Sequence, residues 1–171
     1  METKRLILRD FREEDADDLY AIVGDGETMQ CLEPAYDREK TRAFLASFCI
    51  GARGALAAEH RESGRVIGYI LFKPLEKDVY EIGWIFNQAY WRCGYAYEAC
   101  AAVIDHAFGA LSAHKIVAET IDAARSAGLA QKLGMTLEGV QRAHTRDNDG
   151  NWADLYLYGL LRADWTRAAK G

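Results

Sequence analysis

Hydrophobic and polar positions alternate in some stretches of the chain and recur at helical spacing in others. Lys4–Arg9 alternates charged and aliphatic residues, as a half-buried strand does. Acidic residues at 13–15 precede an apolar stripe that ends at Val23, which predicts a first helix. Residues 24–34 show no clear period, and Asp37 is placed to cap a second helix.

From Gly54 onward, strand periods alternate with two further helices. Strands are expected over 55–60, 66–72, 78–86, 115–121, 135–145 and 152–161, and helices over 94–108 and 124–133. The polar run 61–64 suits a hairpin, 74–77 a turn, and Gly134 a helix end. The pattern predicts one α+β domain over residues 1–171, in the order β-α-α-β-β-β-α-β-α-β-β.

Composition and charge narrow the classes of function. The chain has 171 residues, half of them hydrophobic, and a formal charge of −5. No basic face is visible, so we expect no direct nucleic-acid binding, whereas an acidic surface suits a cationic substrate. No apolar run is long enough to cross a membrane and no signal peptide is seen, so we expect a cytoplasmic protein with no membrane partner.

The cysteines indicate neither a metal centre nor a disulfide framework. Cys31, Cys49, Cys93 and Cys100 form no CxxC pair and have no clustered histidines. We expect four free thiols, with Cys49 and Cys100 acting as small core residues, and no bound metal.

A glycine-containing loop between a strand and a helix is the most informative segment. The run from Glu81 to Ala99 reads as a strand, a short loop and a helix that opens at Gly94-Tyr95-Ala96. Small residues at 94 and 96 let a ligand approach the first helical N–H groups, which have no intrahelical acceptor. Partial positive charge at a helix start favours phosphate. The segment therefore predicts a phosphate-bearing cofactor.

The order of elements, with this loop after the fourth strand, resembles the GNAT superfamily of acetyl-CoA-dependent N-acyltransferases. The loop pattern of that family, Gln/Arg-x-x-Gly-x-Gly/Ala, is matched by Trp91–Ala96, with Trp in the first polar position. Residues 3–9, 90–99, 132–139 and 149–158 resemble the Rim-type ribosomal-protein N-terminal acetyltransferases. The resemblance implies a mixed seven-stranded sheet, splayed between strands four and five, with about four helices.

The resemblance also implies where acetyl-CoA would bind. Its pyrophosphate would lie on the loop of residues 92–97, and its pantetheine amides would pair with strand backbone near Ile85 and Phe86. The candidate cofactor-binding residues are Ile85, Phe86, Trp91, Arg92, Cys93, Gly94, Tyr95, Ala96, Tyr97 and Ser126.

Three residues are candidates for the chemistry. Relatives begin the helix after strand five with Asn-x-x-Ser; here Ala123 replaces the Asn and Ser126 is kept, as the group that would protonate or hydrogen-bond the leaving thiolate. The capping of a helix start explains Ser126 equally well. Glu81, on the strand lining the site, and His144, because histidine titrates near neutral pH, are rival general bases. Glu81 has a second interpretation as a carboxylate paired with a lysine or tyrosine, and Asp154 is expected to hold the last hairpin.

The expected activity is transfer of acetyl from acetyl-CoA to a primary amine by direct attack in a ternary complex. The acceptor is a protein N-terminus or a small molecule such as an antibiotic, amino acid or polyamine. We expect the acceptor groove to involve Gly24–Pro34, with the acids Asp25, Glu27 and Glu33, and the hairpin loop Asn148–Trp152. The alternative is a non-catalytic acyl-CoA-binding module. A homodimer is plausible by analogy with the family, and the loop lacks the Gly-x-Gly-x-x-Gly of a dinucleotide-binding enzyme.

Overall fold

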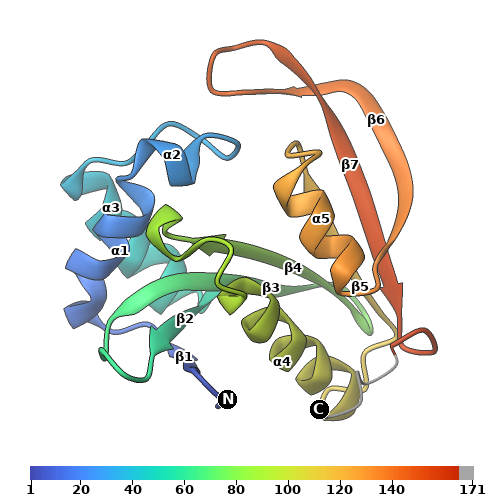
Figure 1. Cartoon of the computed structure of the whole chain (residues 1–171), viewed down its shortest axis with the longest axis horizontal. Coiled ribbons are helices and arrows are strands. Elements are labelled where there is room, and N and C mark those ends of the chain that lie inside the picture. Colours follow the sequence, from blue (N-terminus) through green and yellow to red (C-terminus); the bar gives the residue numbers. More distant parts are fainter. Residues whose placement is uncertain (166–171) are drawn as a thin grey trace.

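A seven-stranded mixed sheet runs through the protein, in the order β1-β2-β3-β4-β5-β7-β6 (Figure 1). The computed structural model describes residues 1–165. The strands are β1 Leu6–Asp10, β2 Ala55–His60, β3 Val66–Glu76, β4 Val79–Phe86, β5 Lys115–Thr120, β6 Thr136–Arg146 and β7 Trp152–Leu161. β4 and β5 pair in parallel, and the other neighbours pair antiparallel. The α+β class and the predicted order of strands are confirmed.

The described part of the chain has five α-helices rather than about four. They are α1 Ala16–Val23, α2 Gly26–Met29, α3 Arg38–Phe44, α4 Tyr95–Gly109 and α5 Arg125–Lys132. The short α2 lies where the sequence showed no clear period. Asp25 starts this helix by accepting hydrogen bonds from the backbone N–H and the hydroxyl of Thr28. Asp37 caps α3 as predicted, and α3 continues into a π-helical stretch, Leu45–Gly51.

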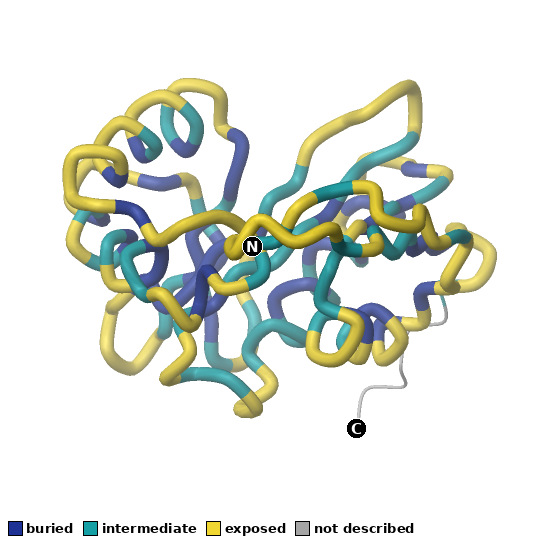
Figure 2. The backbone as a smooth tube through the Cα atoms, turned by 90° about the horizontal axis from the view of Figure 1, so that it is seen from above, coloured by how far each residue is buried: buried dark blue, intermediate teal, exposed yellow. Residues whose placement is uncertain are grey.

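The core lies on both faces of the sheet. On one face, α4 and α5 cover strand residues such as Ile82 and Ile116. On the other face, α1 and the α3 region cover the first strands, with Leu19 and Tyr69 buried between them. Cys49 and Cys100 are buried, as expected, and burial raises the pKa of the Cys49 thiol to about 12. Figure 2 shows the buried backbone in the interior and the exposed backbone along the connecting loops.

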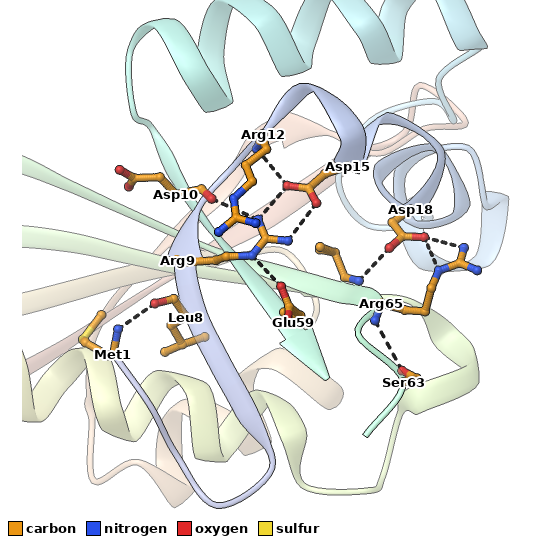
Figure 3. A network of polar contacts seen from close by, with 11 residues as sticks. Met1, Leu8, Arg9, Asp10, Arg12, Asp15, Asp18, Glu59, Ser63 and Arg65 are labelled. Carbon is orange, nitrogen blue, oxygen red and sulfur yellow. Dashed lines mark hydrogen bonds and ion pairs between the residues drawn. The ribbon is translucent and has the colours of Figure 1, made fainter. Parts of the chain in front are cut away.

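A buried ion-pair network joins β1 to the start of α1. The Arg9 guanidinium donates to both oxygens of Asp15, at 2.8 Å each, and its Nε donates to Glu59 on β2 at 2.6 Å (Figure 3). Burial alone would raise the pKa of Asp15, but the hydrogen bonds from Arg9 and from the Arg12 N–H outweigh it and lower the pKa. The pair therefore holds the first helix against the edge of the sheet.

The third strand is longer than its sequence pattern predicted. β3 passes through Pro74, which pairs with Tyr80, and the turn lies at residues 77–78 rather than 74–77. Pairing of β3 with β2 ends at Leu71, so Pro74 faces an open edge. A proline is tolerated there because its missing N–H is not needed by a neighbour.

The two central parallel strands separate soon after they meet. β4 and β5 pair only at Val79–Lys115, Tyr80–Ile116 and Glu81–Val117. Residues 82–86 of β4 and 118–120 of β5 then run on without pairing to each other, and we call this region the β4–β5 wedge. The splay implied by the sequence resemblance is thereby confirmed, and its two strands lead directly to the starts of α4 and α5.

Candidate functional site

The loop after β4 leaves the start of α4 open to a ligand. Gly94 precedes the helix with φ = 82°, and no side chain of residues 1–165 caps this end, whereas α2 and α3 have aspartate caps. Arg92 also has a positive φ of 60°, which is uncommon for a side chain of this size. The backbone N–H groups of residues 95–97 can therefore serve an anion.

Arg5 holds this loop from the N-terminal end of the chain. Its Nη1 donates to the carbonyl of Cys93 at 2.9 Å, and its Nε donates to Glu98 at 2.7 Å. Glu98 also accepts from the hydroxyl of Thr3 at 2.6 Å. Burial alone would raise the pKa of Glu98, but these donors lower it, so the carboxylate stays ionised and the loop stays anchored.

Trp91 fixes the loop to the end of β4. Its indole Nε1 donates to the carbonyl of Phe86 at 2.7 Å, and the Arg125 guanidinium lies 4.4 Å from its ring centroid. The Phe86 carbonyl, a candidate partner for a pantetheine amide, thus already accepts one hydrogen bond. The Phe86 ring is buried. Ile85 is half-buried beside it. On the wedge side of β4, Ile85 has no pairing partner on β5.

The other candidate loop residues surround the start of α4. Tyr95 bonds His60 through its hydroxyl and lies under Arg5, and Tyr97 lies under Lys132. Both rings and Ala96 pack against the core, which gives them a structural role. Cys93 is exposed, and its thiol faces the carbonyl of Trp91 at 3.4 Å.

Asp122, rather than Ser126, caps the start of α5. Its carboxylate accepts from the N–H groups of Ala124 and Arg125, at 3.1 and 2.9 Å, and from the Arg125 side chain at 2.9 Å. Burial alone would raise the pKa of Asp122, but these three donors lower it. The half-buried Ser126 hydroxyl has no hydrogen-bond partner among residues 1–165. It is therefore not used as a cap and remains available to a ligand.

Glu81 lies at the base of the β4–β5 wedge and is paired with Lys73 at 3.0 Å. A cavity of about 230 Å³ opens beside it, lined also by Val117, Glu119 and Leu157. These side chains alternate with the strand residues that α4 and α5 cover, so they point to the opposite face of the sheet. The lysine pairing agrees with the structural interpretation of Glu81, and its role as a base stays a prediction.

His144 lies on an irregular segment of β6, away from Glu81. The register with β7 shifts between Gln141 and Thr145, and Asp154 holds the resulting bulge by accepting from the Ala143 N–H at 2.8 Å. The structural role expected for Asp154 is confirmed. His144 is exposed, and the structure shows no hydrogen bond or ion pair joining it to Glu81 or Ser126 in the described residues.

The two segments expected to form the acceptor groove meet in the structure. Asn148, in the turn between β6 and β7, donates to the carbonyl of Met29 at 3.0 Å. Figure 1 shows the long hairpin of these strands with its turn directed toward α2. Two of the acids proposed to attract a cation are already engaged: Asp25 caps α2, and Glu33 binds Lys40 at 2.9 Å. Glu27 is exposed and remains a candidate to attract a cation.

Comparison with known proteins decides the family. Residues 5–136 match the family model described as "Acetyltransferase (GNAT) domain". The chain belongs to the GNAT acetyltransferase family. It is therefore a transferase of a family that uses acetyl-CoA, and the wedge, the open start of α4 and the loop 91–94 occupy the matched part of the chain.

Individual GNAT relatives extend over nearly the whole chain. An "Uncharacterized N-acetyltransferase YnaD" from Bacillus subtilis is 31% identical over 95% of this chain and 97% of that protein. A solved GNAT acetyltransferase from Bacillus anthracis is 25% identical, with a TM-score of 0.87 over 95% of this chain and 98% of that one. RimL, a ribosomal L7/L12 α-N-protein acetyltransferase solved with coenzyme A, is 19% identical with a TM-score of 0.79, covering 93% and 95%, and so shares the fold.

Two residues of this GNAT site, Arg5 and Asp122, were not proposed as site residues from the sequence. Arg5 lies within a matched stretch, but only the fold brings it to the loop. Asp122 precedes Ala123, and Arg125 neutralises its charge. Within residues 1–165, no group of three or more metal-ligating side chains is found, and no helix is long and apolar enough to span a membrane.

Proposed function

We propose that this protein transfers the acetyl group of acetyl-CoA to a primary amine by direct attack in a ternary complex. The observation that carries the proposal is the uncapped start of α4 beside the β4–β5 wedge. The pyrophosphate would bind the N–H groups of residues 95–97, and the pantetheine arm would follow the unpaired edge of β4 near Ile85. The thioester would then lie between the two strands, where backbone N–H groups can stabilise the oxyanion.

Ser126 is the residue we assign to the departing sulfur. Its hydroxyl is free because Asp122 performs the capping of α5. A hydroxyl donor at this position stabilises the developing thiolate in the transition state.

We further propose an α-amine or another amine of low pKa as acceptor, as in the Rim-type enzymes. Glu81 is bound to Lys73 and His144 is exposed on a distant bulge, so no strong base is evident among the described residues. An α-amine with a pKa of about 7.7 is roughly one-sixth neutral at pH 7, whereas a lysine amine at about 10.4 is roughly one part in 2,500 neutral. A protein N-terminus therefore needs less help than a lysine side chain.

The test is release of free thiol from acetyl-CoA in the presence of an amine panel. The panel contains short peptides with free N-termini, their N-blocked counterparts with one lysine, an aminoglycoside, free amino acids and a polyamine. We expect turnover with the free N-terminal peptides and little with the blocked ones. Preference for the lysine peptides would overturn the acceptor class, and binding of acetyl-CoA without turnover of any amine would favour the acyl-CoA-binding module.

A further inference from the structure

Arg125 crosses the mouth of the β4–β5 wedge. Trp91 is bonded to the last residue of β4 through the Phe86 carbonyl, and Arg125 opens the helix that follows β5. The Arg125 guanidinium lies 4.4 Å from the Trp91 ring centroid, so it links the ends of the two separated strands. On a third side, its Nη2 lies 3.7 Å from the thiol of Cys31, in the segment after α2.

Arg125 pairs with Asp122, but most of its N–H donors are unused. A guanidinium has five N–H donors. Among residues 1–165, only Nε has an oxygen acceptor, the Asp122 carboxylate at 2.9 Å. The side chain is 44% exposed, so its remaining donors can reach a ligand. Asp122 and the Trp91 ring together fix the plane of the guanidinium, which lowers the entropy lost when it binds an oxyanion.

We propose that Arg125 binds the diphosphate of acetyl-CoA through its free N–H donors. The inference rests on the proposed function. Trp91, on whose ring Arg125 lies, is in the same loop as Gly94, so the guanidinium lies beside the loop proposed to hold the diphosphate. Guanidinium and phosphate oxygens form charge-assisted, often paired hydrogen bonds. The first loop position holds Trp91 instead of a polar residue, and the Arg125 guanidinium lies on the face of its ring.

The experiment compares Arg125→Gln with a matched control, Arg38→Gln. Arg38 also lies 4.4 Å from an aromatic ring centroid, that of Tyr20, and pairs with an aspartate, Asp17, but on the helix α3. Dissociation constants are measured for CoA and 3′-dephospho-CoA by calorimetry, and for pantetheine by ligand-detected NMR. Asp122 keeps its two backbone donors in Arg125→Gln, so α5 stays capped.

We expect Arg125→Gln to weaken CoA and 3′-dephospho-CoA equally, by roughly tenfold, because a charge-assisted hydrogen bond is lost. Pantetheine binding should not change, Arg125→Lys should recover part of the loss, and Arg38→Gln should match the parent protein. A loss confined to CoA would assign Arg125 to the 3′-phosphate and overturn the proposal. An equal loss for all three ligands, or no loss, would also overturn it. Failure of the parent protein to bind CoA would instead overturn the proposed function, and the inference with it.

Discussion

Asn148 donates a hydrogen bond from its side-chain amide to the backbone carbonyl of Met29, across 119 residues of sequence. The bond joins the turn of the β6–β7 hairpin to the segment after α1, and Arg125 reaches Cys31 in the same segment. Met29 therefore contacts the hairpin, and Cys31 contacts the start of α5. These two contacts hold the segment proposed for the acceptor groove against the hairpin and α5.

Removal of this bond should loosen both segments. In Asn148→Ala, amide hydrogen exchange in residues 26–33 and 146–152 should become about two- to tenfold faster, since one net hydrogen bond is lost. The measurement is exchange followed by mass spectrometry. Asn151→Ala is the control, because Asn151 bonds Asp147 within the turn. Unchanged exchange at residues 26–33 in Asn148→Ala would show that the contact does not restrain the segment.

Gly94 and Gly64 allow backbone strain to be separated from the binding of the cofactor. Their φ values are 82° and 67°, so alanine at either position should cost about 1 kcal/mol of unfolding free energy. A Cβ at 64 meets open space, whereas one at 94 lies 3.4 Å from Arg5 Nη2, in the proposed pyrophosphate loop. Only Gly94→Ala should weaken the binding of acetyl-CoA, which is measured by calorimetry. Equal affinity for the two variants would argue against a cofactor at this loop.

Ser126→Ala should reduce turnover without destabilising the protein. The hydroxyl has no protein partner among the described residues, so the melting temperature should stay the same. We expect kcat to fall by about tenfold to a hundredfold, the range for loss of one donor or proton-transfer group in the transition state. Asp122→Ala should instead lower the free energy of unfolding, by about 1 kcal/mol, because the cap of α5 is lost. A full rate in Ser126→Ala would remove Ser126 from the chemistry.

The pH dependence distinguishes the acceptor amine from an enzyme base. For a peptide acceptor, kcat/KM should rise through about pH 7.7, where the α-amine itself loses its proton. The rise should persist in Glu81→Gln and in His144→Gln. The measurement is kcat/KM for each variant from about pH 5.5 to about pH 9, a range that brackets the pKa of the amine. Loss of the rise in either variant would identify that residue as the general base.

The Arg9–Asp15 pair should make stability depend on pH in the acid range. The pKa of Asp15 is lower in the folded protein than its ordinary value of 3.8. Its stabilisation is therefore full above about pH 4 and is lost as the pH falls through the folded pKa. Asp15→Asn should cost about 3 kcal/mol at pH 7, because it leaves Arg9 without its main partner, and less at pH 3. Urea unfolding at both values measures the difference, and an equal cost at both would contradict it.

Local patterns predicted most elements to within a few residues. The Asp37 cap, the 61–64 hairpin and the stop at Gly134 depend on contacts between near neighbours in sequence, so the sequence carries their signals. The same patterns missed α2, whose cap is a single aspartate in a stretch without period. They also ended β3 too early, because the tolerance of Pro74 depends on which neighbouring strand is absent.

The candidate site divides in the same way. The loop 91–96 and Ser126 were recognisable because their residues are contiguous and their spacing resembles a family pattern. The function of Arg5 could not be read from spacing, since the fold brings its partners Cys93 and Glu98 to it. The cap by Asp122 is a contact between near neighbours, but it lies outside the Asn-x-x-Ser pattern of the family. Engagement of Asp25 and Glu33 likewise follows from contacts that composition does not show.

The sequence by itself determined the class of the fold, the order of the strands and the place of the glycine loop, because hydrophobic period, caps and turns act over a few residues. The tertiary structure alone decided that Asn148 meets Met29, that Arg125 lies on Trp91, and that Arg5 holds the glycine loop. Each of these contacts joins residues that lie far apart in the sequence. The packing of helices and strands brings such residues together, and no local pattern specifies that packing.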